Sequence, residues 1–258
     1  MTYTVLSLFP AIFEAYFSSS IMAKAVTRDL VTWRLVNIRD YAEDKHKTCD
    51  DAPYGGGAGM LMLARPLCRA LEAAGARKKT AQAPRPRVVY LSPSGAPFSQ
   101  RLAADLAREP ELVLVCGRYE GIDQRVIDLY VDDEISVGDY VLSSGEVAAL
   151  ALIDATYRLL DRVIRAESLD EESFEGGLLE YPQWTRPEKY DNLKVPEVLL
   201  SGHHEHIRKW RLQKRLEKTH AVRPDLLEKG LRGGVFDAET LAMIEIMQKK
   251  AGEDGLEA

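Results

Sequence analysis

Short apolar runs alternate with amphipathic stretches along the first 160 residues. The runs have the length and composition of buried strands and stand at 4–9, 31–36, 87–91, 112–116 and 134–137. Helical spacing follows each run, up to about residue 24, then over 65–74, 99–108, the residues after 121, and 146–160. Because strand and helix alternate, the pattern predicts an α/β fold with a parallel sheet.

Local signals mark the ends of several of these elements. Pro66 stands in the first turn of its predicted helix, and Gly75 follows the end of that helix. Ser99 is placed to cap a helix that ends before Pro110. Residues 40–59 form a polar, glycine-rich loop that is too long to be a simple connector.

The pattern changes after residue 160. Residues 161–177 are rich in acids and poor in apolar side chains, which favours a mobile linker. Residues 178–258 are mainly helical in pattern, with an amphipathic helix at 239–249. We therefore expect an α/β domain at 1–160, an acidic linker at 161–177 and a smaller helical domain at 178–258.

The composition excludes several classes of protein. With 46% apolar and 29% charged residues, the 258-residue chain is neither disordered nor fibrous. No run approaches the roughly 18 uncharged apolar residues of a membrane span, and no basic lead-in of a secretory signal precedes the first apolar run. The three cysteines form no C-x-x-C pair, which disfavours a disulfide scaffold and favours the cytoplasm.

Common nucleotide-binding and hydrolase fingerprints are absent from the sequence. Residues 54–60 fail G-x-G-x-x-G because Met60 stands at the last glycine, and neither a P-loop nor a G-x-S-x-G elbow occurs. His203 and His206 could share a helix face, but neither a third ligand nor H-E-x-x-H accompanies them. We therefore predict no metal site from these histidines.

Three glycine-containing loops, at 92–95, 117–121 and 138–145, follow three successive predicted strands. In an open parallel sheet, ligands bind beyond the carboxyl ends of the strands. Any one of these loops alone is more simply interpreted as a tight turn. Three loops at the same edge favour a site where the backbone approaches a ligand closely.

Residues 203–223 carry a net charge of +5 in a chain whose net charge is −6. At 100° per residue, five cations fall within an arc of about 120°: Arg208, Arg211, Lys214, Arg215 and Lys218. A charge run usually forms a solvated face, but cations without an acid among them repel one another and favour a polyanion. The pattern therefore predicts a helix that contacts phosphate groups.

Seven segments occur in the order found in one known family. They are SLFP at 7–10, PYGGG at 53–57, YLSPSG at 90–95, VCGRYEGID at 115–123, ISVGDYVLS at 135–143, GLLEYPQWTRP at 177–187 and VLLSG at 198–202. From residue 7 to about residue 227 the chain resembles the bacterial tRNA (guanine-37-N1)-methyltransferases. Several long motifs in one order make the resemblance specific.

The resemblance implies a SPOUT methyltransferase, whose parallel sheet carries a deep trefoil knot toward the C-terminal end of the α/β domain. Knots are so rare that propensity would not predict one. The resemblance also implies S-adenosylmethionine as methyl donor, a requirement for magnesium at a site that the sequence does not identify, and tRNA with guanosine at position 37 as substrate. It implies a cytoplasmic homodimer whose active sites are each shared by two chains.

The resemblance assigns residues by position in the motifs. The cofactor site would consist of Tyr90, Leu91, Ser92, Pro93, Gly117, Glu120, Val137, Gly138, Asp139, Tyr140, Val141, Leu142 and Gly145. Contacts with tRNA would come from Asp50, Tyr54, Gly55, Gly59 and Ser173, together with the five cations of the basic face.

Methylation at N1 of guanine requires that the N1 proton leave. A carboxylate against N1 can act as general base, and a guanidinium can stabilise the negative charge that builds on O6. The resembled family has as its base an aspartate followed by Ser-Phe. Glu172 precedes the same pair here and is the expected base, with Glu171 and Asp170 as alternatives. Arg158 matches the catalytic arginine, and a salt bridge to the linker acids is its alternative role.

Two further positions depart from the family pattern. Ser144 stands where glycine is usual, and Ala148 stands where proline is usual. If the residue before Gly145 needs a positive φ, Ser144 costs about 1 kcal/mol. We expect these departures to affect cofactor affinity and not the reaction.

Two other functions share part of this pattern. A related knot methyltransferase that acts on another RNA position or on ribose would not need Glu172, so Glu172→Gln would leave its activity nearly unchanged. An RNA-binding protein that has lost catalysis would bind the cofactor without turnover.

Overall fold

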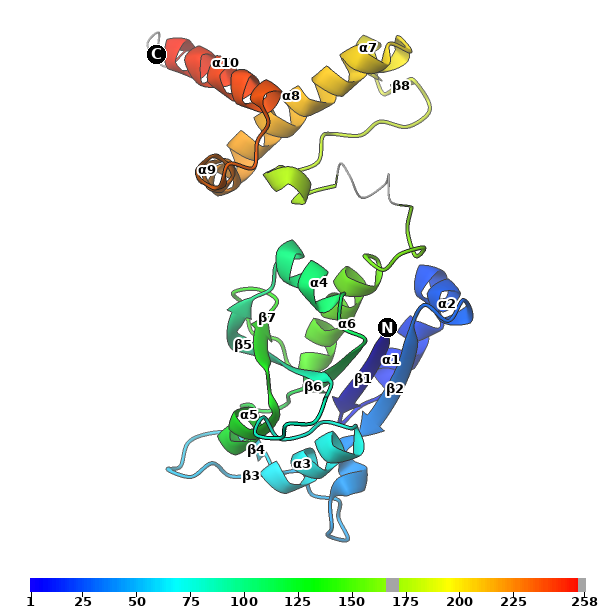
Figure 1. Ribbon diagram of the computed structural model, residues 1–258, viewed down its shortest axis with the longest axis vertical. Coiled ribbons are helices and arrows are strands. Elements are labelled where there is room, and N and C mark those ends of the chain that lie inside the picture. Colours follow the sequence, from blue (N-terminus) through cyan, green and yellow to red (C-terminus); the bar gives the residue numbers. More distant parts are fainter. Residues whose placement is uncertain (166–171, 255–258) are drawn as a thin grey trace. The chain divides into compact units, whose positions relative to one another are not determined.

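The computed structural model describes residues 1–165 and 172–254 (Figure 1). The chain divides into two compact units, unit 1 at Met1–Ile164 and unit 2 at Arg165–Ala258. Each unit has a hydrophobic core of its own. The forces that hold each unit together can therefore be considered separately.

Five parallel strands form the sheet of unit 1, in the order β2-β1-β6-β5-β7. Their bounds are Thr2–Ser7 (β1), Thr32–Asn37 (β2), Arg87–Pro97 (β5), Glu111–Cys116 (β6) and Asp133–Ser136 (β7). Tyr90 of β5 pairs with Val115 of β6 and Glu134 of β7, so the loops after these strands lie at one edge of the sheet. The structure confirms the predicted α/β fold with a parallel sheet.

Helices cover both faces of this sheet (Figure 1). One face packs against α1 (Ala11–Phe17), α2 (Ser20–Thr27), α4 (Gln100–Leu106) and α6 (Gly145–Tyr157), and the other packs against α3 (Ala64–Ala73) and α5 (Gln124–Tyr130). Neighbouring residues of one strand serve opposite faces: Val89 belongs to the first core and Val88 to the second. Because both faces are buried, the strands are continuous apolar runs in the sequence.

The helical stretch expected up to residue 24 is two helices, α1 and α2. The Ser18 hydroxyl donates to the carbonyl of Glu14 at 2.7 Å, and Ser19 takes extended backbone before α2. A serine hydroxyl that bonds to the preceding turn competes with continuation of the helix. The apolar spacing alone does not reveal this break. The predicted cap at Ser99 is confirmed, since its hydroxyl accepts from the Leu102 N–H at 3.3 Å.

The predicted loops contain more regular structure than expected. The polar loop begins in a 3-10 turn, η1 (Ile38–Tyr41), and contains β3 (Asp50–Asp51), which pairs antiparallel with β4 (Leu61–Met62). The turn expected at 92–95 lies within β5, where the pairing with β7 shifts register. Strands of two residues are too short for a sequence pattern to indicate.

Unit 2 is mainly helical. Its elements are η3 (Glu175–Gly177), β8 (Lys189–Tyr190), β9 (Leu193–Lys194), α7 (Glu197–Leu200), α8 (His204–Val222), α9 (Pro224–Gly233) and α10 (Ala238–Asp254). The antiparallel pair of β8 and β9 was not expected. The buried apolar cluster consists of Leu178, Leu216, Leu227 and Ile244. This core is much smaller than those of unit 1.

Among the described residues, no helix is both long and apolar enough to cross a membrane. The cysteines Cys49, Cys68 and Cys116 are free thiols. Burial raises the pKa of the Cys116 thiol well above its ordinary value. Cys116 is therefore a core residue and not a nucleophile at neutral pH.

Candidate functional site

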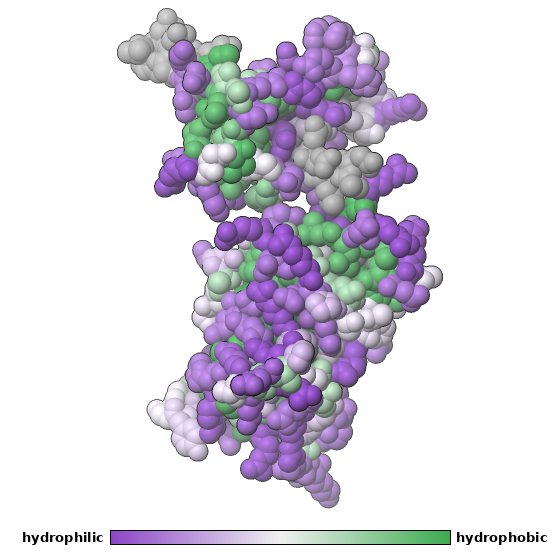
Figure 2. Space-filling model, in the orientation of Figure 1, coloured by the Kyte–Doolittle hydropathy of each residue, from purple (hydrophilic) through white to green (hydrophobic). Residues whose placement is uncertain are grey.

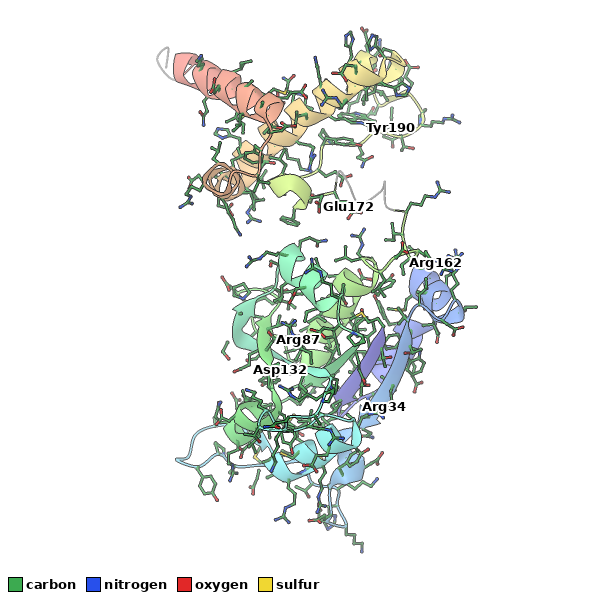
Figure 3. The ribbon with its side chains drawn as sticks, viewed as in Figure 1. Arg34, Arg87, Asp132, Arg162, Glu172 and Tyr190 are labelled. Carbon is green, nitrogen blue, oxygen red and sulfur yellow. The ribbon has the colours of Figure 1, made fainter. Side chains whose placement is uncertain are left out.

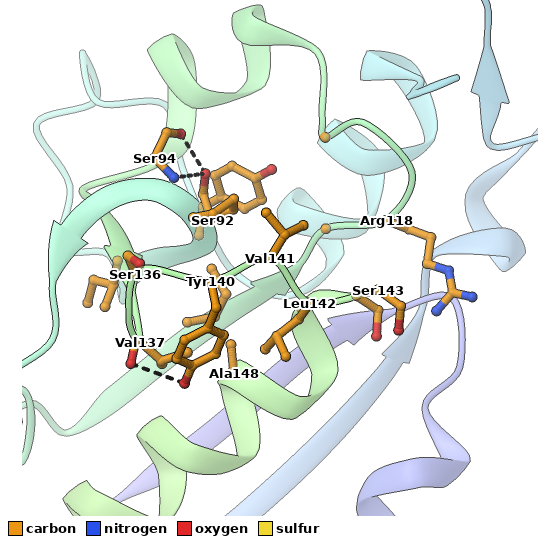
Figure 4. Close-up of a pocket in the computed structure, with 18 of the residues that line it drawn as sticks. Ser92, Ser94, Arg118, Ser136, Val137, Tyr140, Val141, Leu142, Ser143 and Ala148 are labelled. Carbon is orange, nitrogen blue, oxygen red and sulfur yellow. Dashed lines mark hydrogen bonds between the residues drawn. The ribbon is translucent and has the colours of Figure 1, made fainter. Parts of the chain in front are cut away.

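A pocket with a volume of about 320 Å³ lies at the carboxyl edge of the sheet in unit 1 (Figure 4). Residues of 90–94, 117–121 and 135–148 line it. Of the thirteen residues predicted to bind a cofactor, all except Asp139 line this pocket. The three glycine-containing loops therefore form one concave surface, as their common position after the strands predicts.

Backbone lies against backbone where two of these loops meet. The Gly145 N–H donates to the Gly117 carbonyl at 2.8 Å, and Arg118 pairs with Ser144 in an isolated bridge. A Cβ on Gly145 would lie 2.7 Å from the nitrogen of Gly117 and 2.9 Å from the Cα of Cys116. Only glycine fits at 145, because the atoms that it meets belong to the backbone.

At two other glycines of the pocket, an aromatic ring occupies the space that a Cβ would need. A Cβ on Gly117 would meet the Tyr90 ring at 2.8 Å. Gly138, with φ +156°, leaves no space between its backbone and the Tyr140 ring, which a Cβ would meet at 2.4 Å. These glycines let the backbone form a tight wall, which is the property that a close-fitting cofactor site requires.

Short hydrogen-bonded turns hold the polar groups of the wall (Figure 4). The Ser92 hydroxyl lies 2.8 Å from the Ser94 hydroxyl, and the Tyr140 hydroxyl donates to the Val137 carbonyl at 3.3 Å. The Ser136 hydroxyl donates to the carbonyl of Gly138 at 3.0 Å. The wall therefore combines polar turns with the apolar side chains of 141 and 142, a mixture that is typical of small-molecule sites.

A buried carboxylate lies directly behind the loop that begins α6. Glu146 is 1% exposed, and its Oε1 accepts from the Ser7 hydroxyl at 2.6 Å. The Ser7 hydroxyl in turn accepts from the Phe9 N–H at 2.7 Å. This chain of hydrogen bonds ties the end of β1 to the first turn of α6, where a carboxylate also interacts favourably with the helix dipole.

The loop at 50–59 is joined to the loop at 117–121. Glu120 N–H donates to the Met60 carbonyl at 3.0 Å, and a Cβ on Gly59 would meet the Glu120 side chain at 2.4 Å. Burial, followed by a hydrogen bond to Asp50, raises the pKa of Tyr119. Of the residues predicted to contact tRNA, Asp50 and Gly59 therefore lie beside the pocket loop. Tyr54 and Gly55 are exposed at the tip of their own loop.

The two predicted catalytic residues belong to different units. Arg158 is half-buried and is the C-cap residue of α6 in unit 1. Glu172, labelled in Figure 3, is half-buried in unit 2, and its carbonyl accepts from the Glu175 N–H at 3.2 Å. Asp170 and Glu171, the alternative bases, lie outside the described residues.

The turn that carries Glu172 is anchored on α8. Arg215 donates to the carbonyls of Glu175 at 2.8 Å and Leu179 at 3.3 Å. The Leu179 N–H donates to the Thr219 hydroxyl at 2.9 Å. Ser173, predicted to contact tRNA, accepts from the Glu180 N–H within this turn at 3.1 Å. Arg215 was predicted to contact tRNA, and the structure shows that it also holds this turn.

The other cations of the predicted basic face differ in their surroundings. Arg208 pairs with Glu205 at 2.9 Å and with Glu239 at 2.7 Å, and Lys214 pairs with Glu217 at 2.6 Å. The Arg208 hydrogen bond lowers the pKa of Glu205 to about 2.

Arg211 and Lys218 complete the face. The Arg211 guanidinium stacks over the Tyr181 ring at 4.8 Å. Lys218 is exposed, with no ion-pair partner among the described residues. In the helical projection no acid lies within the basic arc. In the structure, Glu205 and Glu217 of α8 and Glu239 of α10 nevertheless reach two of its cations.

His203 and His206 stack with ring centroids 3.9 Å apart. Within residues 1–165 and 172–254, no group of three or more His, Cys, Asp or Glu residues could hold a metal ion. The two histidines therefore pack on each other at the N-terminal end of α8, and the described residues give them no third ligand.

A family model described as tRNA (Guanine-1)-methyltransferase TrmD matches residues 1–229. The chain belongs to this family. Its curated relatives include three proteins named tRNA (guanine-N(1)-)-methyltransferase. The one from Treponema denticola is 61% identical over 239 residues, 93% of this chain and 96% of the relative. Those from Borrelia duttonii and Treponema pallidum are 58% and 56% identical, over 90% and 95% of this chain and 94% and 95% of the relative.

Membership in the tRNA (guanine-1)-methyltransferase family confirms the resemblance seen in the motifs, and the structure shows how one departure from them is accommodated. Ser144 has φ −168°, which is extended backbone that any residue adopts. The cost considered for a positive φ therefore does not arise. Ala148 lines the pocket and is buried, and it adds no polar group there.

Sequence reasoning missed part of the pocket wall. The residues that it did not assign to the cofactor are Ser94, Arg118, Tyr119, Gly121, Ile135, Ser136, Ser143, Ser144 and Ala148. All of them lie in or next to the three loops that were singled out. The position of the loops was the available signal, because residue type alone does not show which side of a loop faces a cavity.

Proposed function

We propose that this protein transfers a methyl group from S-adenosylmethionine to N1 of guanosine 37 in tRNA. The observation that supports this most strongly is the pocket at the carboxyl edge of the sheet, built from the family's motif loops. The names of the relatives support a tRNA guanine as the substrate. A tRNA substrate also fits a location in the cytoplasm.

The pocket residues fit S-adenosylmethionine. Gly117, Gly138 and Gly145 give walls where a Cβ has no room, so backbone groups can contact a flat ligand directly. The side chains of Tyr90, Leu142 and their neighbours supply the apolar contacts. When bound, the cofactor supplies a methyl group that its sulfonium has already activated.

Glu172 is proposed as the general base. N1 of guanine is protonated at neutral pH, so its lone pair becomes nucleophilic only as that proton leaves. The Glu172 carboxylate would take the proton from N1, which would free the N1 lone pair to accept the methyl group that the cofactor would supply. Glutamate keeps the acid group of the family's aspartate and has one more methylene.

Arg158 is proposed to face guanine O6. As the N1 proton departs, negative charge builds on O6, and a guanidinium that is already in place stabilises this charge without reorganisation. Arg158 follows the last residue of α6, and the first residue of that helix, Gly145, lines the pocket. Alignment of N1 with the methyl group and the positive charge of Arg158 would together supply most of the rate enhancement.

The tRNA is proposed to be held by both units. Lys218 and the other cations of the basic face would contact phosphates, and Asp50, Tyr54, Gly55, Gly59 and Ser173 would contact the anticodon loop. The base must be exposed to present N1, which an unpaired loop allows at low cost.

We further propose the domain division 1–160, 161–177 and 178–258, a trefoil knot in the first domain, and a homodimer. The knot follows from the family resemblance, and the contact between Gly145 and Gly117 shows only that the two loops lie against each other. In the dimer, the cofactor pocket of one chain and the linker and helical domain of the other would together form each active site. The acidic linker would bring Glu172 to the guanine when RNA binds, and its expected ordering falls partly on residues outside the described ones, since 172–177 form the turn held by Arg215.

Magnesium is proposed to be required, as the family resemblance implies. The described residues offer no group of three acidic, His or Cys side chains for it, and we derive no step through the ion. Removal of divalent ions with a chelator, followed by their return, measures whether the rate depends on them.

The decisive experiment is mass spectrometry of nucleosides from unmodified tRNA with guanosine at 37, after incubation with the protein, S-adenosylmethionine and magnesium. A matched transcript with adenosine at 37 is the control. We expect N1-methylguanosine only in the first. Methylation at another atom or position would favour a related knot methyltransferase, and cofactor binding without methylation would favour an RNA-binding protein without catalysis.

A further inference from the structure

A second pocket lies entirely within unit 2, and the proposed reaction does not use it. Its volume is about 560 Å³, and its wall includes Tyr181, Trp184, Arg186, Leu199 and Arg211. These residues come from the segment before β8, from α7 and from the first half of α8. It is therefore separate from the cofactor pocket of unit 1.

Flat rings and guanidinium groups form much of this wall. The Trp184 ring lies beside the ring of Trp210, which does not line the pocket, with centroids 5.4 Å apart at 57°, and the Arg211 guanidinium lies 4.8 Å above the Tyr181 ring. Trp184 keeps 42% of its surface exposed. Planar, partly exposed groups of this kind are the surfaces on which unpaired nucleobases stack.

The segment that carries Trp184 has a defined structure without burial. All residues from 182 to 194 are exposed, although β8 and β9 pair within this range. Tyr190, labelled in Figure 3, is 76% exposed. An exposed segment that places aromatic residues beside a pocket is typical of a binding surface and not of a structural core.

The charge around this pocket selects the class of ligand. Residues 181–215 contain eight basic and four acidic residues, a net charge of +4 in a chain of net charge −6. Arg186 is exposed, with no ion-pair partner among the described residues. Figure 2 shows hydrophilic side chains over the α7–α8 end of unit 2. A basic surface attracts polyanions, and the exposed aromatic faces within it favour single-stranded RNA, whose unpaired bases can stack on them.

We infer that this pocket binds one unpaired nucleobase of the tRNA substrate, stacked on Trp184, with Arg186 on the adjoining phosphate. The inference rests on the proposed function, since it takes the RNA to be the tRNA that is methylated. The pocket would hold a nucleotide other than the one that reacts, and it would contribute to affinity and choice of RNA. It would not contribute to the chemical step.

Tryptophan fluorescence and binding measurements test this inference. The chain has three tryptophans, and Trp33 stacks on Phe17 in unit 1. We expect unmodified tRNA to quench the emission of the full-length protein, and we expect most of the quenching to disappear in Trp184→Phe. Trp184→Ala should weaken tRNA binding about tenfold. It should raise the KM for tRNA while kcat and the KM for the cofactor stay unchanged.

Two further variants separate stacking from charge. Arg186→Ala should weaken binding and reduce the dependence of Kd on salt concentration, whereas Trp184→Ala should leave that dependence unchanged. Tyr190→Ala is the matched control, because Tyr190 is an exposed aromatic residue of the same segment that does not line the pocket. It should bind tRNA like the parent protein.

The outcomes are distinct from those of the methylation assay. Quenching that depends on Trp184, in a protein that does not methylate tRNA, would support the pocket and contradict the proposed function. Methylation with unchanged tRNA affinity in Trp184→Ala would overturn the pocket alone. A change of the oligomeric mass in Trp184→Ala without RNA would show an interface between copies and would also overturn it.

Discussion

The two units hold their candidate chemical groups in different ways. In unit 1, backbone packs on backbone: Gly145 meets Gly117 and Cys116 with no room for a Cβ, and a sheet buried on both faces supports the loops. In unit 2, side chains hold the turn that carries Glu172, chiefly Arg215 and Thr219, beside a small core. The first arrangement is stiff because close-packed backbone cannot relax locally, whereas the second depends on single hydrogen-bonding groups.

This difference has a functional meaning under the proposed reaction. A cofactor that binds before the RNA needs a pocket that is already formed, which close-packed backbone provides. A base that acts only on the correct RNA can come from a separate element, since its late arrival protects against wrong substrates. Changes in unit 2 should then affect methyl transfer without affecting cofactor binding.

The largest effect is expected from Glu172→Gln. Loss of the general base should lower kcat about 10²- to 10⁴-fold. Affinity for the cofactor, measured by calorimetry, should be unchanged because the pocket lies in unit 1. Glu175→Gln, an exposed acid of the same turn, is the control and should stay active. If Glu172→Gln keeps full activity, the base is another residue, and Asp170 and Glu171 are the next to replace.

Gly145→Ala should damage the pocket itself. The new Cβ would lie 2.7 Å from backbone nitrogen at 117, so the loops must separate. We expect a loss of about 1–3 kcal/mol in cofactor binding, measured by calorimetry. Gly233→Ala is the control, because a Cβ there meets only the Val235 side chain at an ordinary 3.5 Å. Equal affinity in the two variants would contradict the backbone packing described for unit 1.

Arg215→Ala should loosen the turn that carries Glu172. Displacement of the carboxylate should lower kcat about 10- to 100-fold while cofactor binding stays unchanged. Lys218→Ala, which removes an exposed cation three residues after Arg215 on the same helix, should raise only the KM for tRNA. Partial recovery of kcat in Arg215→Lys would support positioning, since lysine can still donate to one carbonyl. If both alanine variants change KM alone, Arg215 acts only on tRNA.

The smallest effect concerns stability at low pH. Burial raises the pKa of Asp132, but hydrogen bonds from Arg85 and the Val88 N–H outweigh it, so the pKa lies below its ordinary value. The resulting stabilisation is present above the unfolded pKa of about 3.9 and is lost as the pH falls through the folded pKa. Asp132→Asn should cost unit 1 about 1 kcal/mol at pH 7.

Denaturant titrations of both proteins from pH 7 to pH 2 measure this difference. The difference between the two stabilities should shrink as the pH falls, because the parent carboxylate takes up a proton and loses the advantage of its charged form. Asp225→Asn in unit 2 is the control, since Asp225 pairs with Arg223 on the surface. A constant difference between parent and Asp132→Asn across the whole range would show that ionisation of Asp132 is not its source.

The sequence by itself determined the architecture of unit 1 and the place of its pocket. Continuous apolar runs such as 112–116 predict strands buried on both faces, and loops after parallel strands lie at one edge whatever their side chains. The motifs also determined the family. These features follow from local pattern and from the geometry of a parallel sheet, so they can be predicted from one sequence alone.

Only the tertiary structure decided how particular side chains are used. Arg215 belongs to a basic helical face in projection, yet it donates to carbonyls 36 and 40 residues away. Ser144 fits because its backbone is extended, and buried Glu146 accepts a hydrogen bond from Ser7 of β1, 139 residues away in the sequence. Contacts between residues distant in sequence depend on how the elements pack, and periodicity carries no information about them.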